Sequence, residues 1–130
     1  MFIWNYVFQI FMIRYWEDCF RQIPVFTGEL PGDMLAEFQH TPSGINDIIL
    51  STNQGLTDRE LMGVLLHEMC HHVVFESHGM DVQPHGFEWM AEMMRIGFKD
   101  PDWETDGCDF FSEEEYQSIL ELLPKEGECE

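Results

Sequence analysis

The pattern H-E-M-C-H at residues 67 to 71 constrains this chain most, because it lies in a long stretch with helical periodicity. Its two histidines, His67 and His71, are four residues apart and so project from one face of a helix, about one turn from each other. That spacing lets both side chains bind the same zinc ion. Glu68 lies at the flank of this face, where it can accept a proton from a zinc-activated water. The pattern therefore predicts a helix that carries a catalytic zinc site.

The residues around the pattern favour a metal site over two ordinary histidines. Residues 64–66 and 73–75 are all apolar, so the pattern has hydrophobic neighbours on both sides. Histidine and glutamate are costly in such surroundings unless a partner compensates them, and a bound metal ion does so. The alternative is a helix with two partly buried histidines and a solvated Glu68, and it fits these neighbours less well.

A catalytic zinc usually takes a third protein ligand and leaves its fourth position to water. The metzincin pattern is excluded, because it requires glycine and histidine where this chain has Val74 and Ser77. His85 is the first candidate for the third ligand, since Gly86 beside it would let the backbone approach the zinc helix closely. The other candidates, in decreasing order, are Glu88 or Glu92, and then His78.

Capping pairs and turn residues divide the chain into predicted elements. Thr57 with Glu60, and Ser112 with Glu115, match the capping box that begins a helix. The prolines and glycines between residues 24 and 32 indicate a loop. The predicted helices cover residues 3–22, 58–76, 85–96 and 112–123, and the predicted strands, paired as a hairpin, cover residues 34–40 and 45–50.

Length and composition indicate one domain rather than two. The chain has 130 residues, of which 45% are hydrophobic, and this suffices for one hydrophobic core. Within residues 1–130 we expect an N-terminal amphipathic helix (1–24), a zinc-site core (57–97) and an acidic tail with a short helix (100–130). The last residues of the tail, 125–130, are expected to fray.

The charge of the chain restricts its partners. Asp and Glu number 25 against 6 Lys and Arg, which gives a net charge of -19. Such a chain repels phosphate backbones and anionic lipids, so we expect neither direct nucleic-acid binding nor membrane binding. Residues 1–13 are apolar but too short to span a bilayer, and they lack the features of a signal peptide. The four cysteines include no C-x-x-C pair. We therefore expect an intracellular, cytoplasmic protein with reduced thiols.

A longer stretch resembles the SprT-like (Spartan-related) zinc metalloprotease family. The run L-L-H-E-M-C-H-H-V-V-F is followed by a short loop and then by H-G-F-E-W-M-A-E-M-M-R-I-G. Residues 64–97 match the family signature in order and spacing. The resemblance implies a single-domain, zincin-like α+β fold, with an active-site helix, a small sheet and flanking helices. It also implies these roles: His67, His71 and His85 as Zn²⁺ ligands, Glu68 as general base, and Gly86 and Trp89 as structural companions of the third ligand.

The resemblance further implies hydrolysis of peptide bonds by a metal-activated water. Zincins commonly hold the substrate as an added strand on a sheet edge, and the predicted strand 45–50 is our candidate for that edge. The resemblance predicts the activity of this chain better than its substrate. DNA-directed members of the family use basic DNA-binding elements, whereas this chain is acidic. A basic protein or peptide is therefore the first substrate to test.

The rival hypothesis is a non-catalytic, zinc-binding acidic protein that occupies a basic partner surface as a nucleic-acid mimic would. Glu68 favours the enzyme, because a purely structural zinc site has no need of this carboxylate. Hydrolysis of a non-peptide amide is a third hypothesis. The sequence says nothing about the oligomeric state.

Some residues near the pattern have structural interpretations. His72 points away from the metal-binding face, and we expect it on the helix surface. Cys70 is predicted to be a small buried apolar side chain. Trp103 is expected to pin the tail to the body of the domain, together with Phe110 and Phe111.

Overall fold

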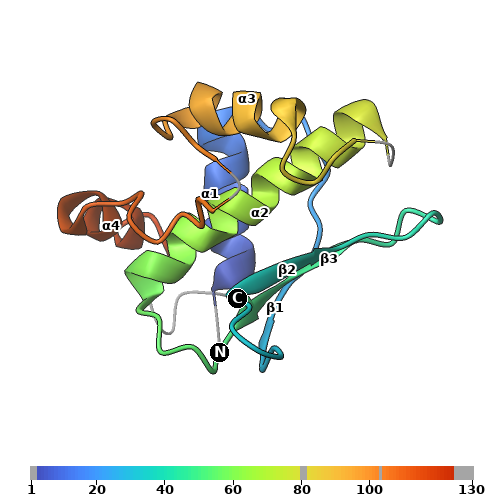
Figure 1. The fold of residues 1–130 in the computed structure, drawn as a ribbon. Coiled ribbons are helices and arrows are strands. Elements are labelled where there is room, and N and C mark those ends of the chain that lie inside the picture. The colour runs from blue at the N-terminus through green and yellow to red at the C-terminus, as the bar shows by residue number, and fades with distance from the viewer. Residues whose placement is uncertain (1–2, 80–81, 103, 125–130) are drawn as a thin grey trace.

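The computed structural model describes residues 3–79, 82–102 and 104–124, which form an α+β fold (Figure 1). The α+β class expected from the sequence is thus confirmed. Trp103 and residues 125–130, for which we predicted a pinning role and fraying, lie outside the described residues. The elements in chain order are α1 (Trp4–Trp16), β1 (Val25–Gly28), β2 (Ala36–Gln39), β3 (Asp47–Ser51), α2 (Asp58–His78), α3 (Phe87–Ile96) and α4 (Glu113–Leu120).

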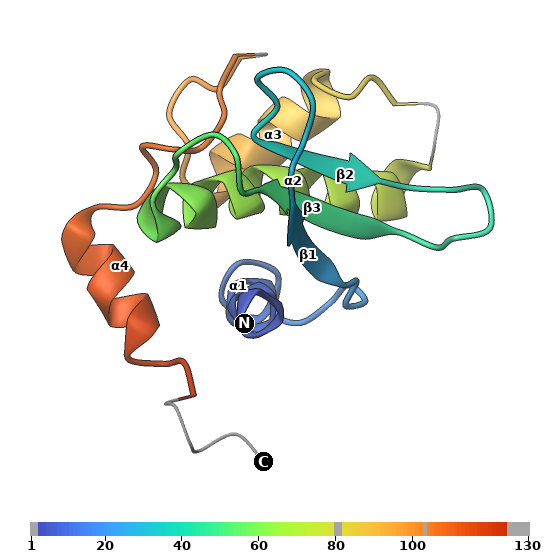
Figure 2. The same ribbon diagram turned by 90° about the horizontal axis from the view of Figure 1, so that it is seen from below.

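The strands of the described residues form one sheet in the order β1-β3-β2. β1 runs parallel to β3, and β2 runs antiparallel to it, as expected for the predicted hairpin. Figure 2 shows α1 alongside β1, with β2 at the opposite edge of the sheet. The prediction that strand 45–50 forms the edge is wrong, because β3 is central. The segment we interpreted as a loop contains β1, which pairs with the other side of β3.

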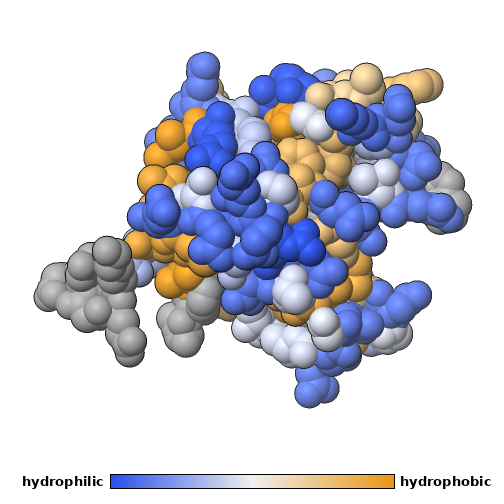
Figure 3. Space-filling view, turned by 90° about the vertical axis from the view of Figure 1, so that its left-hand side faces the viewer, coloured by the Kyte–Doolittle hydropathy of each residue, from blue (hydrophilic) through white to orange (hydrophobic). Residues whose placement is uncertain are grey.

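The core lies where α1, α2 and the sheet meet. The apolar residues of α1 recur at helical spacing, and Val7, Phe8 and Phe11 are fully buried. They pack into one cluster with Ile48 and Leu50 of β3 and the apolar residues of α2. Hydrophilic residues dominate the face shown in Figure 3, with smaller hydrophobic patches between them. Among the described residues, no helix has both the length and the apolarity needed to cross a membrane.

α1 ends at Trp16, six residues before the predicted end. Glu17 has a left-handed backbone with φ 52°, and its N–H donates to the carbonyl of Ile13. Asp18 is left-handed as well, with φ 60°, and its N–H donates to the carbonyl of Met12 at 3.0 Å, so these bonds satisfy carbonyls at the helix end. The polar spacing continues through residue 22, but these backbone hydrogen bonds close the helix first.

α2 is the central element, between the sheet and α3 (Figure 1). Its predicted capping box is present: the Thr57 hydroxyl accepts the Glu60 N–H, and the Glu60 carboxylate accepts the Thr57 N–H. Every residue from 61 to 70 is buried, because the sheet, α1 and α3 all pack on this helix. The H-E-x-x-H pattern therefore begins in the most enclosed part of the fold.

Candidate metal centre

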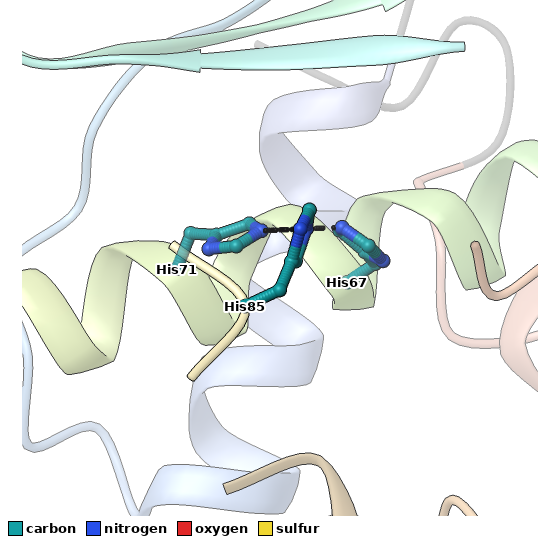
Figure 4. Close-up of side chains that lie close together, drawn as sticks. All are labelled: His67, His71 and His85. Carbon is teal, nitrogen blue, oxygen red and sulfur yellow. Dashed lines mark hydrogen bonds between the residues drawn. The ribbon is translucent and has the colours of Figure 1, made fainter. Parts of the chain in front are cut away.

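Three histidine side chains from two segments point toward one another (Figure 4). His67 and His71 project from one face of α2, and His85 lies in the turn before α3. The Nε2 atom of His71 is 3.2 Å from the Nε2 atoms of both other rings. Tetrahedral zinc with bonds of about 2.0–2.1 Å places neighbouring nitrogens roughly 3.3 Å apart. The three histidines could therefore hold a metal ion, since their candidate ligand atoms all lie within 4.8 Å of one another.

The ring of His67 is oriented by a main-chain group. Its Nδ1 lies 2.8 Å from the carbonyl oxygen of Thr105, which can only accept, so Nδ1 carries the proton and Nε2 keeps its lone pair. Burial and the neighbouring His85 lower the pKa of His67 to about 4. Burial and the two other histidines lower the pKa of His71 to about 2. Both rings are thus neutral at pH 7, as metal binding requires.

Trp89 forms a wall behind the three histidines. It lies on α3, one turn after His85, and is fully buried. Its ring stacks on His71, with centroids 5.3 Å apart and planes 11° apart. It also meets His85 and His67 edge-on, at centroid distances of 4.6 and 5.0 Å. These contacts restrict the rotation of the histidine rings and exclude solvent from one side of the site.

Glu68 lies beside this group and is only 7% exposed. Its Oε2 is 3.7 Å from Nε2 of His67. Burial raises the pKa of Glu68 to about 8, the charge of Glu37 adds to the rise, and a backbone interaction with the Phe38 N–H opposes it. A cation bound at the histidines would also favour the ionised form. The carboxylate is therefore placed to exchange protons near neutral pH.

The other candidate ligands do not join the histidine group. The Glu92 carboxylate accepts from the indole N–H of Trp16 and pairs with Arg95 at 2.6 Å, so it is engaged elsewhere. Glu88 and His78 are exposed. Of the candidates for a third ligand, the structure brings only His85 to His67 and His71 within the part of the chain that it describes.

The histidines and Glu68 line a cleft of about 650 Å³ between β2, α2 and the loops that precede and follow α3. The cleft is strongly acidic. No lysine or arginine occurs among the described residues that line it. Besides Glu68, the carboxylates on its walls are those of Asp33, Glu37, Glu104 and Asp106.

One edge of β2 faces away from the rest of the sheet. The N–H of Ser51 donates to the carbonyl of Leu35 at 2.9 Å, which fixes the alternation of hydrogen bonds between β2 and β3. The main-chain groups of Ala36 and Phe38 therefore point away from β3, and no described strand pairs with them. Both residues line the cleft. β2, rather than the predicted strand 45–50, thus supplies the open strand edge beside the histidines.

Two residues on α2 test the interpretations made from the helical pattern. His72 does point away from the metal-binding face, but the predicted surface position is wrong because this residue is fully buried. It packs near the rings of Phe8 and Phe38, and its Nε2 donates to the carbonyl of Arg21 at 2.9 Å. Cys70 is fully buried, as predicted. The opposite face of α2 is therefore core as well.

Sequence reasoning missed two main-chain groups of the site. The Thr105 carbonyl orients His67, and the Phe38 N–H acts on Glu68. Neither contact uses a side chain, so residue type carries no signal for it. Only the fold, which brings the loop after α3 and the edge of β2 to α2, could have revealed them.

Of the comparisons with known proteins, a match to a family model assigns the chain to a family. A search of curated proteins gave no match. A family model described as the SprT-like family matches residues 19–109, which is more than half of the chain. The matched region contains the sheet, α2, α3 and the loop that carries Thr105. The chain therefore belongs to the SprT-like family.

Proposed function

We propose that this protein is a zinc-dependent endopeptidase with a zincin-like fold, acting on a protein or peptide substrate. The observation that carries the proposal is the meeting of three histidine nitrogens beside Glu68 in an open cleft. Membership of the SprT-like family supports a metalloprotease-like activity. His67, His71 and His85 would hold the zinc through Nε2 and leave one coordination position open.

The catalytic cycle assigns two proton transfers to Glu68. Zinc, when bound, supplies Lewis-acid polarisation of the scissile carbonyl and activation of a water molecule near neutral pH. Glu68 accepts a proton from this water as the water oxygen bonds to the carbonyl carbon. Glu68 then gives the proton to the leaving nitrogen as the carbon–nitrogen bond breaks. The Phe38 N–H favours the ionised state that Glu68 needs at the start of the cycle.

The cleft favours an extended, basic substrate. A segment of the substrate would add to the open edge of β2 through main-chain hydrogen bonds, a common mode of peptide recognition. The acidic cleft walls attract lysine and arginine side chains, and the net charge of -19 extends this preference to the whole molecule. On the same grounds we propose that the protein does not bind nucleic acid directly.

The metal site is tested by counting zinc and removing it. We expect one zinc per chain, and cleavage of an unfolded basic protein that stops with a chelator and returns with added zinc. Replacing His85 with alanine should weaken zinc binding by more than about 100-fold, because a ligand matters more than the groups around it. Chelator competition measures this affinity. The control is His78→Ala, an exposed residue outside the group. Undiminished zinc binding in His85→Ala would contradict the assignment.

Strand addition is tested with proline at the open edge of β2. Ala36→Pro removes an N–H that points away from β3, which an edge strand tolerates. We expect kcat/KM for an unfolded protein to fall about tenfold, the effect of one lost hydrogen bond, with an unchanged melting temperature. Glu37→Pro is the matched control, because it removes an N–H directed at β3 and should lower the melting temperature instead. Normal cleavage by a folded Ala36→Pro variant would exclude β2 as the docking edge.

The second candidate function is that of a non-catalytic zinc-binding protein that covers a basic partner surface. The acidic cleft and the net charge favour it. Its signature would be one bound zinc and tight binding to a basic protein, with no cleavage that depends on Glu68. Zinc content, binding to a basic protein and Glu68-dependent cleavage, measured on the same purified protein, therefore distinguish the two functions.

A further inference from the structure

α2 and the loop after α3 touch backbone to backbone at Gly63 and Gly107. A Cβ atom at Gly63 would lie 1.8 Å from the carbonyl oxygen of Gly107, and one at Gly107 would lie 2.2 Å from that of Gly63. Real Cβ atoms essentially never come within 3.0 Å of such atoms. Both positions therefore require glycine in this arrangement, and any side chain would push the loop away from the helix.

The position of Gly63 indicates that this close approach matters. Glycine is the least favourable helix residue after proline, and Gly63 lies inside a helix with a well-formed capping box. Alanine would suit the isolated helix better. The glycine is explained by the approach of Gly107 rather than by the needs of α2 itself.

Both glycines of this contact are close in sequence to residues of the metal centre. Gly63 lies one helical turn before His67, and Gly107 lies two residues after Thr105. Between them, the Thr105 carbonyl accepts the Nδ1 proton of His67 at 2.8 Å. A loop displaced by the width of a methyl group would no longer place this carbonyl within hydrogen-bonding distance.

The loop is also held in shape by a local turn. The Thr105 N–H donates to the carbonyl of Asp102 at 3.0 Å, and the Thr105 hydroxyl accepts the Asp102 N–H at 2.9 Å. This turn fixes the direction of the Thr105 carbonyl relative to the loop. The contact between the glycines fixes the loop relative to α2.

We propose that Gly63 and Gly107 are positioning residues for the metal centre. Their contact holds the Thr105 carbonyl against His67, which keeps the proton on Nδ1 and presents the lone pair of Nε2 to the metal. Without this acceptor the neutral ring is free to place its proton on Nε2, where it blocks metal binding. The inference rests on the proposed zinc site, and the experiments below separate the failure of one from the failure of the other.

The first experiment measures zinc affinity by chelator competition in Gly107→Ala. We expect binding 10- to 100-fold weaker than wild type, the range found when groups that orient metal ligands are removed. Gly44→Ala is the matched control. Both glycines have a left-handed backbone, with φ 98° and 86°, but no described atom lies within 4 Å of a Cβ added at Gly44. Wild-type affinity in Gly107→Ala, or an equal loss in Gly44→Ala, overturns the proposal.

The second experiment reads the tautomer of His67 directly, by nitrogen NMR of the histidine rings in metal-free protein. Wild type should carry the proton on Nδ1, and Gly107→Ala should shift the population toward Nε2. This signal would not move if the glycine contact served stability alone. A wild-type His67 with its proton on Nε2 overturns the proposal.

A milder variant decides the question if Gly107→Ala does not fold. Thr105→Val removes the hydroxyl that accepts the Asp102 N–H without creating any overlap. We expect a smaller loss of zinc affinity and a partial loss of the Nδ1 tautomer, and no change in either contradicts the proposal. A wild-type protein that binds no zinc refutes the proposed function instead, and the tautomer still tests the positioning of His67.

Discussion

Replacing Glu68 with glutamine is expected to lower kcat/KM for protein cleavage by about 10²- to 10⁴-fold, the usual contribution of a general acid–base group. Glutamine has the same shape, but it cannot take the proton of the attacking water or return it to the leaving amine. Zinc content should stay at the wild-type level, because Glu68 lies beside the histidine group and is not one of its members. Steady-state cleavage of an unfolded basic protein and metal analysis measure the two quantities.

The control for this variant is Glu37→Gln. Glu37 also lines the cleft and also carries a carboxylate, but it lies on β2 rather than beside His67. Its replacement leaves the proton carrier in place and only lowers the pKa of Glu68 by removing a neighbouring negative charge, so most of kcat should persist near neutral pH. Wild-type turnover by Glu68→Gln would refute the proposed mechanism, and equal losses in both variants would mean that cleft charge alone is responsible.

Replacing Trp89 with alanine should have the largest effect on stability. The ring is fully buried and packs against all three histidines. Truncation of a buried tryptophan costs about 3–5 kcal/mol, because transfer energy is lost and a cavity remains. Urea unfolding of metal-free protein measures this loss. Zinc affinity of the folded fraction should fall as well, since the three histidine rings lose the indole ring that packs against them.

Trp89→Phe provides the comparison for that experiment. No hydrogen-bond partner of the Trp89 indole N–H occurs among the described residues, so phenylalanine should lose packing volume but no hydrogen bond. We expect a clearly smaller loss of unfolding free energy and retention of the zinc site. If Trp89→Ala unfolds at the wild-type urea concentration, Trp89 is not the support described above.

Local signals sufficed for the centre of the fold. α2 could be predicted because Thr57 and Glu60 mark its start and apolar residues follow at helical spacing. The hairpin of β2 and β3 could be predicted because the segment between them is rich in turn residues. The histidine group followed from the four-residue spacing on α2 and from the glycine beside His85.

Non-local pairing could not be predicted in the same way. β1 has four residues and is held by a parallel partner more than twenty residues away, so no nearby turn signals it. Without β1, the hairpin alone leaves β3 as an edge strand, which is the source of the wrong prediction. The early end of α1 depends on the left-handed backbone of Glu17 and Asp18. Glycine is the residue that usually adopts this conformation, so a glutamate followed by an aspartate does not predict it. The burial of His72 depends on which elements pack against α2. The periodicity of the α2 sequence gives no information about those elements.

The dual position of β2 has a mechanical consequence for the proposed enzyme. The strand offers its outer edge to the substrate, and its Phe38 N–H acts on the proton carrier Glu68. A substrate that enters out of register and displaces the strand would therefore also change the proton affinity of Glu68, which must take the proton of the attacking water. Misfitting chains would then be bound and released intact. The enzyme would thus discriminate between substrates by the rate of proton transfer as well as by the strength of binding.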